Sequence, residues 1–254
     1  MCLIAWNWQP GSAIPLLLLG NRDEFYARPT APLQHWADAP ILAGRDLQAG
    51  GTWLGVARGP TGMRLAALTN YRSASPPRSD APSRGDLVAN FLRSPLSAET
   101  YLQGLQAQAS TYNSFNLLVF DGQTLLGLES RGAHIVHMEP GLGAVSNADF
   151  HTPWPKLQQL RKGLEAQLER GDTEDGQLMP LLQSRTLAAD AELPKTGIPL
   201  ELERALSAVF IATPHYGTQA SSMVRLGAQG VEFSEWRFGA EGPLGRNRLA
   251  LNAS

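Results

Sequence analysis

The sequence predicts an α+β protein, a four-layer α/β/β/α sandwich in which two antiparallel sheets pack together and helices cover their outer faces. Short apolar runs separated by tight Pro/Gly and Asp-Gly turns are typical of antiparallel hairpins. The order of elements is strands, two helices, strands, helices, strands, which differs from the regular alternation of a parallel βαβ fold. The first hairpin is apolar on both faces, as expected of strands buried between two layers.

Length and composition indicate one globular domain. Of the 254 residues, 43% are hydrophobic and 17% are charged, and the charged fraction is below the roughly 25% of typical soluble domains. No Pro/Gly/Ser-rich linker divides the chain, so we expect residues 1–254 to form a single domain. The net charge of −2 provides no basic surface for nucleic acid.

The sequence also predicts a cytoplasmic location and no membrane span. The most apolar run near the N-terminus, residues 14–19, contains Pro15 and is far shorter than the roughly 20 residues that cross a bilayer. No basic leader or small-residue cleavage site of a signal peptide precedes it. The single cysteine excludes an internal disulfide, which suits a reducing compartment.

The first two dozen residues predict a buried hairpin. Residues 3–8 form one apolar run, Pro10-Gly11 a turn, and residues 14–19 a second run. The hairpin places Cys2 beside a strand end that continues into Arg22, Asp23 and Glu24. Residues 25–40 are expected to be irregular, since their prolines exclude a long helix.

The middle of the chain predicts a second hairpin, two helices and a meander. Residues 52–58 and 64–71 form the hairpin, which ends in the polar residues Asn70 and Arg72. Ser83 and Ser97 are expected to cap helices over residues 84–92 and 97–109. Four short runs with tight turns then predict an antiparallel meander over residues 116–120, 124–129, 134–138 and 141–146.

The last part predicts helices followed by strands. Thr152 and Pro153 are expected to start a helix that Gly171 ends. Further helical stretches cover residues 173–183 and 200–208, and strands cover residues 209–212, 218–226 and 231–238.

Cys2 has a special chemical position. Cells usually remove an initiating methionine that precedes a residue as small as cysteine, and Cys2 would then carry its own α-amine. The thiolate is the reactive form, and a neighbouring amine or cation lowers the thiol pKa from about 8.5. A nucleophile and its base would thus lie within one residue, as in the pairing of threonine with an N-terminal amine.

Seven motifs, in order along nearly the whole chain, resemble the NRDE family, also called the transport and Golgi organisation protein two family. They are Met1-Cys2, Asn21-Arg22-Asp23-Glu24-Phe25, Gly50-Gly51-Thr52-Trp53-Leu54-Gly55, Leu68-Thr69-Asn70-Tyr71-Arg72, Ser146-Asn147, Thr152-Pro153-Trp154 and Tyr216-Gly217-Thr218. The resemblance implies an N-terminal-nucleophile hydrolase-like fold, similar to the cysteine enzymes that cleave conjugated bile salts and penicillin V.

The resemblance also implies site roles. Cys2 would be the nucleophile, Arg22 a cation that stabilises the thiolate, and Asp23 a partner of the α-amine. Asn70 and Asn147 would donate to the tetrahedral oxyanion, an effect worth roughly 3 to 4 kcal/mol per donor. The expected substrate-binding residues are Asn21, Glu24, Arg72, Tyr216 and Thr218.

Two features differ from the family and the amidases. The family commonly has arginine after Tyr-Gly-Thr, where this chain has Gln219. The amidases also space their Arg and Asp further apart than Arg22 and Asp23, and adjacent side chains on a strand point to opposite faces. Structural interpretations compete with the site roles: Arg22, Asp23 and Glu24 as an ion-pair cluster, and the two asparagines as loop caps.

The expected function is hydrolysis of an amide or thioester in a small acyl compound, without a cofactor. The alternative is a non-catalytic protein that binds haem, acyl-coenzyme A or lipid on the same fold. His134 and His137 fall on opposite faces of a strand and form no metal clamp, so single haem ligands would come from His35, His151 or His215. No Gly-x-Ser-x-Gly, Walker or His-Glu-x-x-His motif is present.

Overall fold

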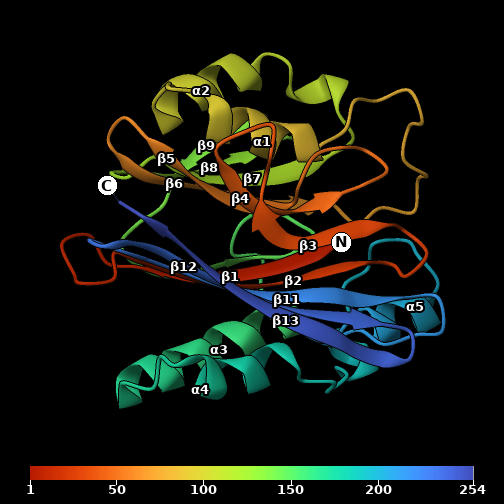
Figure 1. Cartoon of the computed structure of the whole chain (residues 1–254). Coiled ribbons are helices and arrows are strands. Elements are labelled where there is room, and N and C mark those ends of the chain that lie inside the picture. The colour runs from red at the N-terminus through yellow and green to blue at the C-terminus, as the bar shows by residue number, and fades with distance from the viewer. Residues whose placement is uncertain (254) are drawn as a thin grey trace.

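Two antiparallel sheets lie face to face in the computed structural model, which describes residues 1–253 (Figure 1). One sheet has six strands in the order β10-β1-β2-β11-β12-β13. Its strands are β1 (Cys2–Trp8), β2 (Leu16–Phe25), β10 (Gly141–Val145), β11 (Tyr216–Gly227), β12 (Gly230–Gly239) and β13 (Gly242–Asn252).

The other sheet has seven strands that follow one another in chain order. They are β3 (Thr30–His35), β4 (Ile41–Asp46), β5 (Leu54–Gly59), β6 (Gly62–Asn70), β7 (Phe115–Phe120), β8 (Leu125–Glu129) and β9 (His134–His137). All pairings within both sheets are antiparallel.

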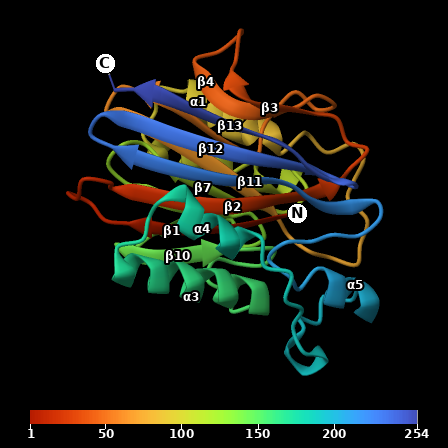
Figure 2. The same cartoon turned by 60° about the horizontal axis from the view of Figure 1, so that its bottom comes forward.

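Helices cover both outer faces, which confirms the predicted sandwich (Figures 1 and 2). The seven-stranded sheet is covered by α1 (Gly85–Arg93) and α2 (Ala98–Gln106), and the six-stranded sheet by α3 (Pro155–Arg170) and α4 (Asp175–Leu182). A short helix, α5 (Leu200–Ala205), and two 3-10 turns, Ala109–Thr111 and Asp190–Glu192, complete the elements.

Burial on both faces of the first hairpin explains why it is apolar throughout. Ile4 and Leu18 belong to the core between the sheets, whereas Leu3 and Leu19 pack against the α3 and α4 layer. Each of these side chains is fully buried. Because alternate residues point to opposite faces, the strand needs apolar side chains at both its odd and its even positions.

The strand β2 continues further than the apolar run predicts. Residues 20–22 pair with β1, and residues 20–25 pair with β11 with one register shift between Thr218 and Ala220. The polar side chains from Asn21 to Asp23 are buried within the strand. Arg22 therefore lies on the inter-sheet face with Cys2, and Asp23 lies on the α3 face. The alternation expected of adjacent strand residues is present.

The predicted four-strand meander is wrong in its last strand. β7, β8 and β9 pair in sequence, but β10 crosses to the other sheet and pairs with β1, where Ile4 lies opposite Val145. Gly143 permits this pairing, because a Cβ there would lie 2.2 Å from the indole of Trp6. The crossing brings Asn147, just beyond β10, to the beginning of β1.

Several boundaries also differ from the prediction. Residues 25–40 contain the edge strand β3, which tolerates Pro32 beside an irregular pairing. The helix expected at Pro153 begins at Pro155 instead, and neither Thr152 nor Ser83 provides a side-chain cap. Ser97 does cap α2, accepting the Thr100 N–H at 3.2 Å.

One predicted strand is absent, and one observed strand was not predicted. Residues 209–212 form only an isolated bridge, because their backbone groups bond elsewhere: the Val209 carbonyl accepts from Asn21, and the Ile211 N–H donates to Thr218. The prediction missed β13, whose residues are mostly exposed on the edge of the six-stranded sheet.

Candidate active site

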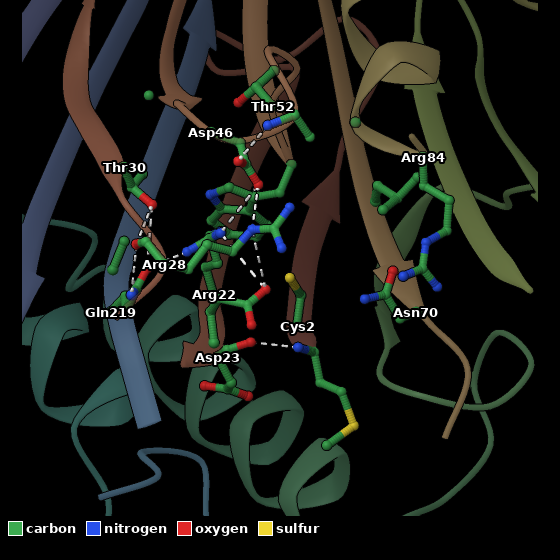
Figure 3. Close-up of a pocket in the computed structure, with 18 of the residues that line it drawn as sticks. Cys2, Arg22, Asp23, Arg28, Thr30, Asp46, Thr52, Asn70, Arg84 and Gln219 are labelled. Carbon is green, nitrogen blue, oxygen red and sulfur yellow. Dashed lines mark hydrogen bonds and ion pairs between the residues drawn. The ribbon is translucent and has the colours of Figure 1, made fainter. Parts of the chain in front are cut away.

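A pocket of about 590 Å³ lies where β1 begins, between the two sheets. Its lining includes Cys2 and Arg22 from the six-stranded sheet, Asn70 from the end of β6, and Arg84 before α1 (Figure 3). Segments far apart in the sequence thus meet around the only cysteine.

Strand pairing places Cys2 and Arg22 side by side. The Met1 ammonium donates to the Asp23 carbonyl, and the Asp23 N–H donates to the Met1 carbonyl at 2.6 Å. The next pair along, Cys2 and Arg22, is therefore a non-hydrogen-bonded pair, in which opposite Cα atoms approach to about 4.5 Å and the side chains lie on one face.

An ion-pair cluster holds the Arg22 guanidinium. Its terminal nitrogen lies 3.7 Å from both the Glu24 and the Asp46 carboxylate. Arg28 bridges the same two acids, with its Nε 2.7 Å from Asp46 and 3.9 Å from Glu24. Arg22 and Glu24 thus form the ion pair that the structural interpretation of this segment predicts, whereas Asp23 is not part of the cluster. The cluster also forms one wall of the pocket.

Gln219 is a further partner of Arg22. It is the extra residue of a β-bulge, because the register of β11 against β2 shifts between Thr218 and Ala220. Its Oε1 accepts from Arg22, and its Nε2 donates to the Phe25 carbonyl at 2.7 Å. The side chain thus connects Arg22 to the backbone at the end of β2.

The Cys2 thiol is buried and protonated with Met1 in place. Burial raises its pKa to about 11, while the N-terminal ammonium and Arg22 act in the opposite direction. The lowered pKa expected of Cys2 with a free α-amine stays a prediction for the chain without Met1. The desolvation of a side chain that is only 5% exposed outweighs the neighbouring cations.

Asp23 lies on the other face of β2, close to the N-terminus. Its Oδ1 accepts from Thr218 Oγ1 at 2.8 Å, and its buried Oδ2 has no partner among the described residues. Burial raises the pKa of this carboxyl, opposed by the charge of Lys156 and by the N-terminal ammonium. The site thus offers an unsatisfied acceptor at the chain start.

Tyr216 completes the surroundings of the N-terminus. Its hydroxyl accepts from the Met1 ammonium and donates to the Asp23 carbonyl, both at 3.0 Å. Tyr216 and Thr218, both expected to bind substrate, therefore contact the N-terminus and Asp23 respectively.

Asn147 connects strands instead of facing the thiol. Its Nδ2 donates to the Cys2 carbonyl at 3.2 Å and to the Asn70 carbonyl at 2.9 Å, and its Oδ1 accepts from Lys156 Nζ at 3.1 Å. Both amide hydrogens are occupied. Asn70 differs: its side chain lines the pocket, and its buried Oδ1 has no partner among the described residues.

Two other expected substrate-binding residues lie outside the pocket. Asn21 Nδ2 donates to two carbonyls of the helical layer, at Leu182 and Val209, each at 2.8 Å. Arg72 forms a buried ion pair with Glu203 and borders a separate pocket of about 500 Å³. Only Glu24 of the five both lines the Cys2 pocket and contacts its charged side chains.

Three functional candidates escaped the sequence prediction. No sequence pattern indicated Lys156, because a lysine near a helix start is usually exposed. In the structure its side chain is buried, with 1% exposed. Arg84 was predicted only as the first residue of a helix. Glu235 did carry a signal: it shares strand parity with the inward-facing Val231 and Phe233, and it is buried in the lining of the pocket.

The three histidines considered as haem ligands, His35, His151 and His215, are exposed and do not line the Cys2 pocket.

Within residues 1–253, no helix is long and apolar enough to cross a membrane.

The sequence matches known proteins over most of its length. The family described as "Transport and Golgi organisation 2" matches residues 1–239. The "Transport and Golgi organization protein 2 homolog" of Bos taurus is 34% identical over 262 residues, covering 92% of each chain. The human protein of that name is 33% identical over 264 residues, with the same coverage of both chains. "Transport and Golgi organization protein 2" of Drosophila melanogaster is 30% identical over 253 residues, covering 88% of this chain and 87% of its own.

Proposed function

The chain belongs to the Transport and Golgi organisation 2 family, and we propose that it is a cysteine hydrolase acting on an amide or thioester of a small acyl compound. The observation that carries the proposal is the position of Cys2. The only cysteine begins the first strand, lies opposite Arg22, and lines a pocket large enough for a small acyl compound. Burial of a lone cysteine for packing alone would require neither the arginine nor the cavity.

The proposed reaction uses the mature N-terminus after loss of Met1. The neutral α-amine of Cys2 takes the thiol proton, and the thiolate attacks the carbonyl carbon of the substrate. The Asn70 amide donates to the oxyanion, and Arg22 stabilises the thiolate. The tetrahedral intermediate then collapses and expels an amine or thiol, which takes the proton from the α-ammonium. Water, deprotonated by the same α-amine, attacks the carbonyl carbon of the acyl-enzyme, the C–S bond breaks and the acid is released, and the Cys2 thiolate takes the proton back from the α-ammonium.

The surroundings of the N-terminus support a role for Met1 removal. With Met1 in place, the nitrogen of Cys2 is an amide and cannot act as a base, and burial holds the thiol pKa at about 11. Asp23 and Tyr216 contact or face the charged N-terminus, and the unpartnered Asp23 Oδ2 provides an acceptor for an ammonium. An amine on Cys2 itself would add a base and a positive charge beside the thiol.

We expect removal of Met1 to increase the reactivity of Cys2 with iodoacetamide at pH 7 by at least about tenfold, because each unit of pKa decrease raises the thiolate fraction about tenfold in this range. Two matched proteins are compared, one released with Cys2 as its first residue and one that retains Met1, with intact mass confirming each. The same pair is incubated with acyl thioesters and acyl p-nitroanilides.

An acyl adduct on Cys2 and product release, seen only in the Cys2-first protein and absent from its Cys2→Ala variant, would support the hydrolase. Equal alkylation of both forms, together with no acyl adduct from any of these substrates, would reject it.

A further inference from the structure

The two walls of the Cys2 pocket differ in charge balance. On the β2 side, Arg22 and Arg28 share two acids, Glu24 and Asp46, so that wall is close to neutral. The opposite wall carries Arg84, for which no ion pair with an acid exists among the described residues. The charge of Arg84 is therefore not balanced by an ion-paired acid among the described residues.

The backbone holds Arg84 rigidly at this wall. The following residue, Gly85, packs directly on Gly51, where a Cβ would lie 2.4 Å from the Gly85 carbonyl carbon. The Gly85 carbonyl also accepts the Thr52 N–H at 3.3 Å. This contact between two glycines fixes the start of α1 against the loop before β5, and with it the position of the arginine.

The Arg84 guanidinium makes few contacts of its own. One terminal nitrogen donates to the Ser114 carbonyl at 3.2 Å. Burial lowers the pKa of Arg84, and the nearby Cys2 and Glu24 act in the opposite direction. Figure 3 shows Arg84 on the same side as Asn70, with Cys2 between them and Arg22. A bound anion stabilises a partly desolvated cation that has N–H donors not used in other hydrogen bonds.

We propose that the compound bound in this pocket carries an anionic group, a carboxylate or a phosphate. Arg84 binds this group while the carbonyl of the compound lies at Cys2. The inference rests on the proposed function for the identity of the reacting carbonyl, but the anion site itself does not require catalysis. Arg78, which also lines the pocket and bonds the carbonyls of Ser110 and Thr111, adds positive charge at the same wall. Substrates of this class are acidic acyl amides or thioesters.

The test compares two thiol reagents that differ in charge. Iodoacetate and iodoacetamide both alkylate Cys2, and the ratio of their rate constants is measured in the folded protein and in the same protein unfolded in urea. We expect the ratio of iodoacetate to iodoacetamide to be at least tenfold higher in the folded state. Arg84→Gln should bring it within about twofold of the unfolded value, Arg84→Lys should keep part of the preference, and Arg93→Gln, at the exposed end of α1, should leave it unchanged.

The comparison separates anion binding from thiol activation. If Arg84 only stabilised the thiolate, Arg84→Gln would slow both reagents equally and the ratio would stay the same, which would overturn the proposal. If Cys2 reacts too slowly with either reagent, thermal unfolding provides the second measurement. Succinate or inorganic phosphate should raise the Tm of the wild type and of Arg93→Gln but not of Arg84→Gln, and the more effective of the two identifies the anion. The absence of any Arg84-dependent shift would also overturn it.

The two proposals can fail separately. An anion preference that depends on Arg84, without acyl transfer to Cys2, would retain the anion site and reject the hydrolase. Acyl transfer with no such preference would retain the hydrolase and reject the anion site.

Discussion

Replacing Asn147 by alanine is expected to lower the free energy of unfolding by about 3 kcal/mol at pH 7. The side chain lies at the point where β1, the end of β6 and α3 meet, and its hydrogen bonds reach the Cys2 and Asn70 carbonyls and the Lys156 ammonium. Its removal leaves two buried carbonyls without this donor and the ammonium without its acceptor.

The titration of Lys156 sets the size of this effect. Burial lowers the pKa of Lys156 to about 8, so the neutral amine is only about 1.4 kcal/mol less stable than the ammonium at pH 7. Deprotonation of Lys156 therefore limits the loss of stability caused by removing its acceptor. The unpaired Cys2 and Asn70 carbonyls add about 1 kcal/mol each to that loss. The lysine's part of the penalty should decrease above pH 8, where the amine is neutral in both proteins.

Urea unfolding at pH 7 and pH 9.5 measures the effect. Adding Lys156→Met to Asn147→Ala should recover about 1 kcal/mol at pH 7, because the buried charge is removed with its partner. Asn90→Ala, an exposed amide on α1, serves as the control and should change stability by less than about 0.5 kcal/mol. A loss below 1 kcal/mol, or one that Lys156→Met does not reduce, would show that the network does not stabilise the fold.

The predictable part of the fold came from periodicity and turns. Runs buried on both faces, such as residues 16–19, identify sheet-on-sheet packing because a sheet with one exposed face does not tolerate them. The crossing of β10 was not predictable from turns, because Pro140-Gly141 fits a hairpin as well as a change of sheet. Gly143 against Trp6 selects the crossing, and that contact exists only once both sheets are assembled. Side-chain hydrogen bonds likewise replaced the strand expected at residues 209–212.

The candidate site was predictable where strand alternation applies. Alternation separates Arg22 from Asp23, and the observed register then places Arg22 opposite Cys2. It gives no information about Arg84 or Lys156, because both come from helix starts whose positions depend on tertiary packing. The pKa of the thiol was also beyond the sequence, since the dominant cause is desolvation and the depth of burial depends on all layers of the fold.

Glu235 is expected to make the stability of the protein decrease as pH rises from about 5 to 7. The carboxyl group is 4% exposed, and its Oε1 accepts the Leu33 N–H at 2.7 Å. Burial raises its pKa to about 7, although the Leu33 N–H, Arg237 and Arg22 act in the opposite direction. Because the folded-state pKa exceeds the ordinary value of about 4.5, the unfolded chain loses this proton first. The stabilisation is complete below the unfolded pKa and is lost as pH rises through the folded pKa.

The expected loss is about 3 kcal/mol, since one unit of pKa difference corresponds to about 1.4 kcal/mol. Glu235→Gln cannot ionise and keeps an acceptor for Leu33, so the difference in urea-unfolding free energy between wild type and variant isolates this group. Relative to the wild type, the unfolding free energy of the variant should increase between pH 4.5 and 7, and the difference should stay constant at higher pH. Parallel stability curves would contradict the prediction.

Ionisation of Glu235 also connects stability to binding in the pocket. Above pH 7 the carboxylate adds negative charge to the lining that Arg84 shares, and a bound anion is then repelled. The iodoacetate preference of the wild type should therefore decline between pH 6.5 and 8, while that of Glu235→Gln stays constant. An equal decline in both proteins would assign the pH dependence to the thiol or to Lys156, both of which titrate in the alkaline range with Met1 in place. A decline confined to the wild type would link the buried carboxyl to the charge of the site.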